Sequence, residues 1–326
     1  MVTGGAGFIG SNLVDRLLAE GNEVDVVDDL STGTLANLSA ARSNPANELS
    51  FYNIDIRSDG IVELITRRKP NVIFHLAAQA DVRVSVARSL FDADVNILGS
   101  LKVLEGARAV DGARLVFAAS GGTLYGEPDP GKLPISESSP HRPLSPYAVS
   151  KKAVIDYLHA YRELHDVEFC ALALANVYGP RQDIHGEAGV VAIFARHLLG
   201  GGSCTIFGDG SQTRDFVYVD DVVDAFVRAA ERGGGLVMNI GTGIETSVND
   251  LYATMSRLAG VDRRAEYKPG RPGELHRNCL DPSRAGIHLG WKPWTLLDDG
   301  IRSVLEDIRF APGGADPGSA SANPIS

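Results

Sequence analysis

The sequence predicts an α/β fold, in which a doubly wound parallel sheet is followed by a smaller C-terminal lobe. Strand-like and helix-like segments alternate through the first half of the chain, which is typical of a parallel sheet with helices on both faces. A glycine-rich turn at residues 3–10 stands between the first strand and the first helix. After residue 176 the predicted elements become shorter, which indicates a second lobe built from late segments.

The composition is that of a soluble globular protein. The 326 residues are 44% hydrophobic and 22% charged, and they can form one long α/β domain or two smaller ones. The net charge of −10 argues against nucleic acid or an anionic membrane as a main partner. Three widely spaced cysteines fit no metal or redox pattern, so we expect reduced packing residues and no metal. We find no membrane span and no signal peptide, and therefore expect a cytoplasmic protein.

The glycine turn, Thr3-Gly4-Gly5-Ala6-Gly7-Phe8-Ile9-Gly10, predicts a Rossmann-like dinucleotide-binding loop. Gly4 permits a tight turn off the strand, Gly7 lets the backbone approach a pyrophosphate, and Gly10 lets the next helix pack close to the sheet. Apolar residues at helical spacing follow between residues 13 and 18, so an amphipathic helix would point its amides at the phosphates. The alternative is a glycine-rich turn that binds no ligand.

An acidic pair at the end of the next strand, residues 24–28, favours NAD as the cofactor. Asp28 lies about 20 residues after the glycines, where a carboxylate commonly holds the ribose hydroxyls of NAD. Asp29 stands beside it, and the next basic residue is Arg42, so a 2′-phosphate would be repelled. One feature departs from the pattern. Only residues 1–3 precede Gly4, whereas a strand is usually about five residues long. Either the true start lies upstream, or the strand is a stub and we expect the middle of the sheet to be weakened.

The remaining elements are predicted from hydrophobic periodicity and turn residues. We expect further strands at 49–54, 71–76, 114–119, 168–174, 204–207, 216–219 and 237–240. We expect further helices at 62–65, 95–109, 145–165, 189–199, 220–231 and 248–258. The predicted organisation is a nucleotide-binding domain at 1–175, a ligand-binding lobe at 176–310 that is interleaved with it, and a disordered tail at 311–326.

The pattern Tyr147-Ala148-Val149-Ser150-Lys151 is the strongest indication of catalysis. Residues four apart on a helix share a face, so Lys151 is expected beneath the phenol of Tyr147, where its charge would lower the pKa of Tyr147. A phenolate could then take a proton from a substrate hydroxyl. Ser120 ends the predicted strand at 114–119 and could share a proton with Tyr147, and Thr123 is a second candidate. The alternative for Tyr147 and Lys151 is an ordinary surface pair.

With these motifs the chain resembles the extended short-chain dehydrogenase/reductases, which are also called the NAD-dependent epimerase/dehydratase family. Within this family it is most similar to the bacterial UDP-glucose 4-epimerases. The resemblance covers about residues 1–310. Besides the glycine loop and the pair of Tyr147 and Lys151, it rests on Asp28-Asp29, Asp55-Ile56, Leu76-Ala77-Ala78-Gln79, Asn176-Val177-Tyr178-Gly179-Pro180-Arg181 and Arg214-Asp215-Phe216-Val217.

The resemblance implies roles for individual residues. Besides Gly4, Gly7, Gly10, Asp28 and Asp29, it assigns to NAD the residues Phe8, Ile9, Asp55, Ile56, Leu76, Ala77, Ala78, Gln79, Asn96, Tyr147 and Lys151. It makes Ser120, Tyr147 and Lys151 the catalytic triad. It assigns to a UDP-sugar the residues Ser120, Thr123, Asn176, Gly189, Val190, Thr205, Phe207, Arg214, Arg271 and Glu274, with the two arginines on the diphosphate.

The implied activity is NAD-dependent 4-epimerisation of a UDP-hexose through a transient 4-keto sugar, in a homodimer formed by the helices at 95–109 and 145–165. Related dehydratases and decarboxylases carry an acidic residue just after the strand-end hydroxyl, whereas the first carboxylate here is Glu127. Asn278 stands where many UDP-glucose epimerases carry a tyrosine, so UDP-N-acetylglucosamine and UDP-glucuronate stay open as substrates. The alternative from another class is a non-catalytic NAD-binding sensor or scaffold, against which Tyr147 and Lys151 count.

Overall fold

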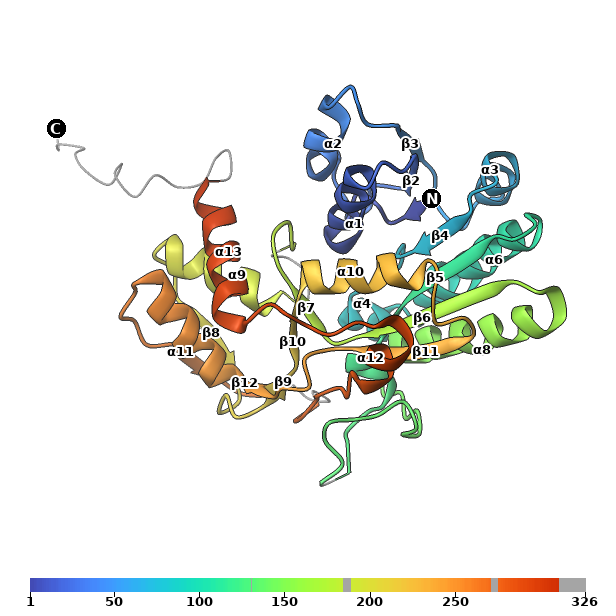
Figure 1. Cartoon of the computed structure of the whole chain (residues 1–326). Helices are drawn as coiled ribbons and strands as arrows, with labels where there is room; N and C mark the ends of the chain where they lie inside the picture. Colours follow the sequence, from blue (N-terminus) through green and yellow to red (C-terminus); the bar gives the residue numbers. More distant parts are fainter. Residues whose placement is uncertain (130, 184–188, 271–274, 311–326) are drawn as a thin grey trace.

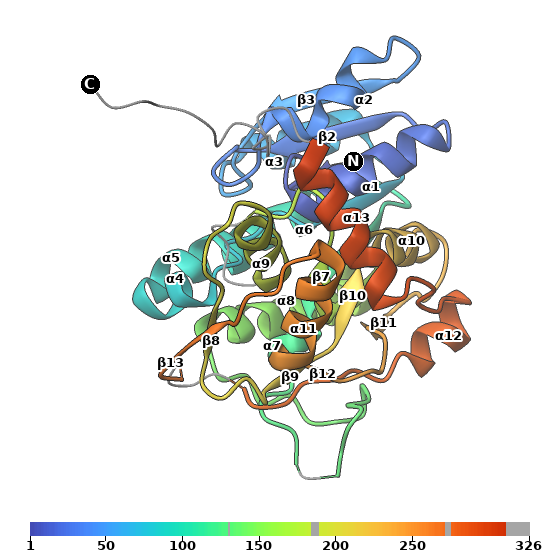
Figure 2. The same ribbon diagram turned by 90° about the vertical axis from the view of Figure 1, so that its left-hand side faces the viewer.

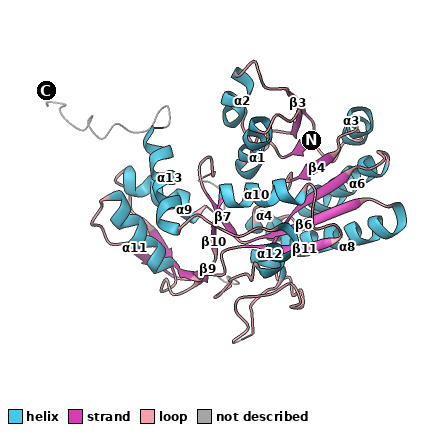
Figure 3. Cartoon of the chain, viewed as in Figure 1, coloured by secondary structure: helices cyan, strands magenta, loops and turns pink. Residues whose placement is uncertain are grey.

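The computed structural model describes residues 1–129, 131–183, 189–270 and 275–310, and it confirms the predicted fold class. A seven-stranded sheet has the order β3-β2-β1-β4-β5-β6-β11, and all neighbouring strands are parallel (Figures 1 and 3). Its strands are β1 (Val2–Thr3), β2 (Val24–Asp28), β3 (Leu49–Asn53), β4 (Val72–His75), β5 (Arg114–Ser120), β6 (Glu168–Leu174) and β11 (Leu236–Ile240).

Two rows of helices cover the sheet, as a doubly wound fold requires. In one row α1 packs against α10, and α10 packs against α12; in the other, α3 packs against α6, and α6 against α8. The first row consists of α1 (Phe8–Ala19), α10 (Val219–Ala229) and α12 (Ser283–Leu289), and the second of α3 (Gly60–Arg68), α6 (Ser100–Arg108) and α8 (Pro146–His165).

The predicted boundary near residue 175 does not divide the sheet from the smaller lobe. β11 pairs with β6 along its whole length, from Leu236 opposite Cys170 to Ile240 opposite Leu174. The helix α10 contacts both α1 and β6. Late segments therefore complete the large sheet.

The smaller lobe lies to the left of the sheet in Figure 1 and in front of it in Figure 2. It contains α9 (Val190–Leu199), α11 (Val248–Ala259) and α13 (Leu297–Phe310), which pack on one another. Three short strand pairs accompany them, and they are β7 (Asn176–Tyr178) with β10 (Phe216–Tyr218), β8 (Thr205–Phe207) with β13 (Glu266–Lys268), and β9 (Thr213–Arg214) with β12 (Thr246–Ser247).

Several elements differ from the sequence-based expectation. The predicted helix at 95–109 begins with a π-helical segment, η2 (Asp94–Gly99), before it continues as α6. Short helices stand where no element was predicted: η1 (Leu35–Leu38), α2 (Ser39–Ser43), α4 (Val82–Ala87), α5 (Ser89–Ala93) and α7 (Gly121–Leu124). Within the described ranges, every helix is too short or too polar to cross a membrane. The predicted tail at 311–326 lies outside those ranges.

The central strand β1 is as short as expected, yet its pairing extends beyond its two residues. Val2 lies opposite both Val26 and Phe74. The amino group of Met1 donates to the Val72 carbonyl at 2.9 Å, and the Gly4 amide donates to the Val27 carbonyl at 2.8 Å. The short strand is therefore bonded on both sides at the centre of the sheet.

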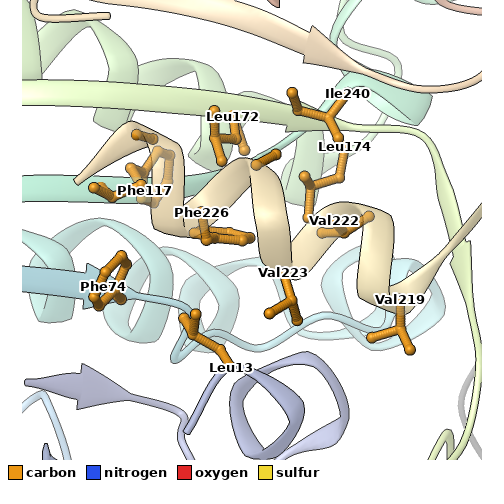
Figure 4. Close-up of a cluster of buried hydrophobic side chains, with 14 of the residues drawn as sticks. Leu13, Phe74, Phe117, Leu172, Leu174, Val219, Val222, Val223, Phe226 and Ile240 are labelled. Carbon is orange, nitrogen blue, oxygen red and sulfur yellow. The ribbon is translucent and has the colours of Figure 1, made fainter. Parts of the chain in front are cut away.

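The helix α10 supplies the core on its side of the sheet. Figure 4 shows Phe226 and Val222 directed toward the strands, with Phe74 and Leu13 close by. Phe226 is fully buried, and its ring meets that of Phe74 edge to face at a centroid distance of 6.4 Å. Because α10 also contacts α1, this cluster joins the glycine-loop helix to the late segments of the chain.

Phe226→Ala is expected to lower the free energy of unfolding by about 3–5 kcal/mol, since it removes a buried ring and leaves a cavity. Urea unfolding followed by circular dichroism measures this change, with Leu164→Ala, at a position 74% exposed on α8, as the control. Equal unfolding midpoints for the two variants would contradict the place of Phe226 in the core.

Candidate functional site

The predicted cofactor residues lie at one edge of the sheet. In a parallel sheet the carboxyl ends of all strands meet at the same edge, and ligands bind there. The order β4-β1-β2-β3 brings together the segments that follow these strands, which contain Leu76–Gln79, Gly4–Gly10, Asp28–Asp29 and Asp55–Ile56. β5 and β6 continue the same edge toward Ser120 and Asn176.

The geometry of the glycine loop requires glycine at Gly4 and Gly10. Gly4 has a φ of +70°, which side-chain-bearing residues rarely adopt, and a Cβ there would lie 2.7 Å from the Ala77 amide nitrogen. A Cβ on Gly10 would lie 2.1 Å from the Gly4 carbonyl oxygen, so α1 can start this close to the loop only with glycine. Gly7 has an ordinary conformation, and its Cβ would lie 3.2 Å from that oxygen. The first turn of α1 has neither a side-chain cap nor an acidic residue.

Asp28 connects the glycine loop to the loop after β2. Its Oδ2 accepts from the Ala6 amide and its Oδ1 from the Leu30 amide, both at 2.9 Å. Burial raises the pKa of Asp28, and these two hydrogen bonds oppose the rise. Asp29 is exposed and caps its own turn by accepting from Ser31. Gly33, which the sequence did not indicate, leaves room for the Asp28 carboxylate. A Cβ on Gly33 would lie 3.0 Å from that carboxylate.

The segments after β3 and β4 are held by side-chain hydrogen bonds. The Asp55 carboxylate forms a bidentate ion pair with Arg57, at 2.6 Å for the shortest contact, and this lowers the pKa of Asp55. Ile56 is buried next to Gly99. Asn96 accepts from the Gln79 amide and donates to the Gln79 carbonyl, so η2 fixes the backbone of the loop after β4.

A buried histidine that the sequence analysis missed lies behind this loop. His75 Nδ1 is 2.7 Å from the Thr3 hydroxyl, and His75 Nε2 is 2.9 Å from the Ser100 hydroxyl. The Ser100 hydroxyl donates to the Asn96 carbonyl, so we assign the proton of the ring to Nε2 and let Nδ1 accept from Thr3. Burial and the nearby Lys151 lower the pKa of His75 to about 3, and the ring is neutral at physiological pH.

The three proposed catalytic side chains come together at the end of β5. Thr123 Oγ1 donates to Ser120 Oγ at 3.0 Å, which leaves the Ser120 proton available to another acceptor. The side chain of Ser120 is hydrogen-bonded to Tyr147. Ser145 caps α8 by accepting from the Ala148 amide, and this fixes the first turn, which carries Tyr147.

The expected effect of Lys151 on Tyr147 is wrong for this arrangement. The Lys151 ammonium donates to the Ala118 carbonyl at 2.9 Å and lies 5.8 Å from the centre of the Tyr147 ring. Burial raises the pKa of Tyr147 to about 12; the hydrogen bond with Ser120 opposes the rise and the charge of Asp92 adds to it. Burial also lowers the pKa of Lys151 to about 8. In the protein alone, Tyr147 is therefore a protonated phenol at neutral pH, because burial disfavours the charged phenolate.

The predicted substrate residues that the structure describes lie at the ends of β5 and β6 and on elements of the smaller lobe. The Asn176 amide donates to the Asp215 carbonyl at 2.9 Å, and the pairing of β7 with β10 places Arg214 close to this point. Gly189 is the N-cap of α9 and Val190 its first residue, as predicted for a helix start. Thr205 and Phe207 lie on β8, partly buried. Arg271 and Glu274 lie outside the described residues.

Asp215 organises this border. Its fully buried carboxylate accepts from the hydroxyl and amide of Thr242 and from the amides of Gly243 and Leu280. Leu280 in turn lies against Gly121, where a Cβ would be only 2.4 Å from a Leu280 methyl group. The segment that carries Asn278 is therefore held next to the end of β5.

Asn278 is the one residue of this segment with unpaired buried polar atoms in the described structure. It is 1% exposed, and neither its side-chain oxygen nor its side-chain nitrogen has a hydrogen-bond partner. Its backbone amide donates to the Thr213 carbonyl, beside Arg214. Glu127 accepts from the backbone amides of His276 and Arg277, and so fixes the same segment.

Comparisons with known proteins place the chain in a family. A model of the NAD-dependent epimerase/dehydratase family matches residues 1–241. The chain belongs to this family. It is 49% identical to the UDP-glucose 4-epimerase of Mycolicibacterium smegmatis over 310 residues, which are 95% of this chain and 98% of that protein.

Solved structures agree with this membership. A Thermotoga maritima UDP-glucose 4-epimerase with UDP-glucose has a TM-score of 0.90 and 43% identity, and covers 94% of this chain and 97% of its own. The UDP-glucose 4-epimerase of Thermus thermophilus in complex with NAD has a TM-score of 0.87 and 40% identity, and covers 95% and 98%. As in other members of this epimerase/dehydratase family, NAD is the cofactor, and the side-chain-free cradle at Gly7 and Gly10 with uncapped amides of α1 fits its diphosphate.

Alanine at Gly7 and at Gly10 should separate cofactor binding from folding. Gly10→Ala places a Cβ against the backbone of Gly4, and we expect it to lower the melting temperature and abolish NAD binding. Gly7→Ala should leave the melting temperature close to that of the wild type and weaken NAD binding roughly tenfold, about 1.4 kcal/mol. Thermal unfolding and calorimetric titration with NAD measure the two effects. Unchanged NAD affinity in Gly7→Ala would exclude a diphosphate at this loop.

Proposed function

We propose that this protein is an NAD-dependent UDP-glucose 4-epimerase, an isomerase that interconverts UDP-glucose and UDP-galactose. The observation that carries the proposal is the cluster of Ser120, Tyr147 and Lys151 at the carboxyl end of β5, on the same edge of the sheet as the glycine cradle. The similarity to UDP-glucose 4-epimerases extends over nearly the whole chain and supports the assignment of substrate.

The cofactor would lie across the carboxyl ends of β4, β1, β2 and β3. The amides at the start of α1 would hold the diphosphate, and Asp28 with Asp29 the adenosine ribose. Asp28 already accepts two backbone amides, so we expect it to hold the ribose and the glycine loop together. The remaining residues proposed for NAD are Phe8, Ile9, Asp55, Ile56, Leu76, Ala77, Ala78, Gln79 and Asn96.

The chain's own residues would move one proton and hold the substrate for it. Tyr147 takes the proton of the sugar 4-hydroxyl and later returns it, while Ser120 donates a hydrogen bond to the same oxygen. Thr123 orients Ser120 by donating to its oxygen. Lys151 would favour the phenolate of Tyr147 only together with the positive nicotinamide ring of bound NAD⁺. When bound, NAD⁺ supplies the reversible two-electron oxidation at carbon 4 of the sugar.

The smaller lobe would hold the nucleotide part of the substrate. The amides of Gly189 and Val190 at the start of α9 and the guanidinium groups of Arg214 and Arg271 suit a diphosphate. Asn176 lies between the two lobes and suits the sugar. We assign Thr205 and Phe207 to the uracil and Glu274 to the uridine ribose, following the family pattern.

The surroundings of Ser120 favour epimerisation over dehydration or decarboxylation. Elimination needs an additional acid or base, but Gly121 and Gly122 follow Ser120 directly. The first carboxylate, that of Glu127, already accepts from two backbone amides of the segment at 276–277. The Glu127 carboxylate therefore fixes that segment and is not positioned as the additional acid or base.

A second candidate substrate is UDP-N-acetylglucosamine, and Asn278 is the observation that favours it. Both polar atoms of its buried side chain lack partners within the described structure, and a buried amide without a partner is unfavourable. An acetamido group could supply both a donor and an acceptor to this amide. UDP-glucuronate is a further alternative of the same reaction type.

The first experiment is turnover of UDP-galactose by the purified protein without added NAD. We expect UDP-glucose to form, because a cofactor held in the cradle is regenerated in each cycle. Tyr147→Phe should lower turnover by at least about a hundredfold and keep NAD bound, since a general base typically contributes 10²–10⁴-fold. Tyr157→Phe, on the exposed side of the same helix, is the matched control.

The other outcomes of this experiment are equally informative. Turnover of UDP-N-acetylglucosamine but not UDP-galactose would assign the second candidate substrate. Binding of NAD with no turnover of any of the three UDP-sugars would refute the enzyme and favour the sensor or scaffold. Full activity in Tyr147→Phe would refute Tyr147 as the base.

We further propose that the protein is a homodimer. Apolar side chains are exposed along α5, η2 and α8, and these elements pack on one another: Leu90 is 86% exposed, Leu98 53%, Val149 49% and Tyr157 42%. On α8, Leu158 packs inside the subunit, whereas Tyr157 is exposed. A second copy could cover this surface.

Leu98→Glu should convert the dimer into a monomer, because it places a charge in the proposed interface. Sedimentation velocity measures this change. Ile287→Glu, at a position 78% exposed on α12, should leave the dimer intact. A monomeric wild-type protein would refute the proposal.

A further inference from the structure

Asp92 on α5 is a completely buried carboxylate whose function the reaction scheme leaves open. It is 0% exposed, and a buried charge needs hydrogen bonds or an opposite charge to be tolerated. Its Oδ2 accepts from the Ser150 hydroxyl at 2.6 Å, and its Oδ1 accepts from the side-chain nitrogens of Gln79 and Asn96, each at 3.0 Å. All three donors are uncharged.

These hydrogen bonds connect three parts of the site. Gln79 belongs to the loop after β4 that is assigned to the cofactor, and Asn96 to η2. Ser150 lies on α8, one residue before Lys151 and three after Tyr147, so all three belong to the same two turns of the helix. Asp92 therefore holds the catalytic helix at a fixed position relative to the cofactor loop.

Asp92 is also the anion whose charge acts on the Lys151 ammonium. Lys151 is 3% exposed, its ammonium bonds to the neutral Ala118 carbonyl, and it lies 4.8 Å from the centre of the Phe117 ring. No ion pair of Lys151 occurs among the described residues. The charge of Asp92 raises the pKa of Lys151 and of Tyr147, opposing the effect of burial on Lys151 and adding to it on Tyr147.

The other charged groups near Asp92 point elsewhere. His75 of β4 is neutral, as described above. Arg57 and Arg88 both lie over the ring of Phe91, on the outer side of α5. Asp94 is paired with Arg57 at 3.1 Å, and Asp81 with Arg83 at 2.7 Å. Lys151 and Tyr147 are therefore the titrating groups on which a change at Asp92 acts.

We propose that Asp92 is a positioning residue of the epimerase reaction: its charge keeps Lys151 protonated in a dehydrated site, and its bond to Ser150 holds Tyr147 and Lys151 in register with the cofactor loop. This inference rests on the proposed function. It goes beyond the triad because Asp92 is completely buried and acts through Ser150 and Lys151.

Asp92→Asn tests the charge with little change in shape. The asparagine oxygen can still accept from Gln79 and Asn96, and its amide can donate to Ser150 once the Ser150 hydroxyl turns. Without the anion, the pKa of Lys151 and that of Tyr147 both fall. We therefore expect both limbs of the kcat–pH profile to move toward acid by about one pH unit.

Two matched variants separate charge from structure. Ser150→Ala removes the hydrogen bond and keeps the carboxylate, so it should lower kcat without moving the profile. Asp94→Asn neutralises an aspartate two residues along the same segment whose charge is paired with Arg57, and its profile should stay in place. A shift of equal size in Ser150→Ala and Asp92→Asn would show that the hydrogen bond, and not the charge, controls the profile, and would overturn the proposal.

A measurement that needs no turnover keeps the inference separate from the proposed function. The Cε–Hε resonance of Lys151, assigned by its loss in Lys151→Arg, reports the pKa of the ammonium by nuclear magnetic resonance in the full-length protein. It should titrate about one pH unit lower in Asp92→Asn than in the wild type. An unchanged Lys151 titration overturns the role of Asp92, whereas absence of epimerase turnover in the wild type overturns only the proposed reaction.

Discussion

The hydrogen bonds of one buried histidine hold the middle of this protein together. β1 is only two residues long, and so it contributes few backbone bonds to the centre of a seven-stranded sheet. Thr3 compensates by accepting from the Ala77 amide and donating to His75, whose opposite nitrogen donates to Ser100 on α6. Because a buried polar group without a partner is unfavourable, the four groups fix one another's orientation. The strand that the sequence suggested would weaken the sheet is thus bonded to β4 and, through His75, to α6.

The same series of hydrogen bonds continues toward the proposed catalytic residues. Ser100 donates to the Asn96 carbonyl inside the π-helical segment, and the Asn96 side chain reaches both Gln79 and Asp92. π-helical turns are rare and frequently mark functional positions, since the extra residue redirects the side chains around it. The series reaches α8 at Ser150, whose hydroxyl donates to Asp92. The glycine loop and the catalytic helix, although far apart in the sequence, therefore rest on one continuous dehydrated network.

Local patterns made much of this structure predictable. The glycine turn, the buried strands and the helix with Tyr147 and Lys151 each leave a signature within a few residues, and the structure confirms these elements. The strand predicted at 216–219 is β10, but β7, β9 and β12 are segments of two or three residues, so no periodicity could indicate them or their pairing. His75 and Asp92 were missed because a polar residue in an apolar segment gives no sign of its partners. The pKa of Tyr147 depends on burial, which spacing alone does not reveal.

The charges around Tyr147 explain why the protein alone should not form the reactive base. The pKa of Tyr147 of about 12 and the pKa of Lys151 of about 8 leave a neutral phenol beside an ammonium at neutral pH. The charge of Asp92 stabilises this arrangement because it raises both pKa values. A phenolate then requires further positive charge close to Tyr147, and the nicotinamide ring of bound NAD⁺ would bring such a charge. The residues that hold the catalytic helix in place thus also make its proton transfer conditional on a filled site, so an unreactive phenol in the protein alone is consistent with a catalytic role for Tyr147.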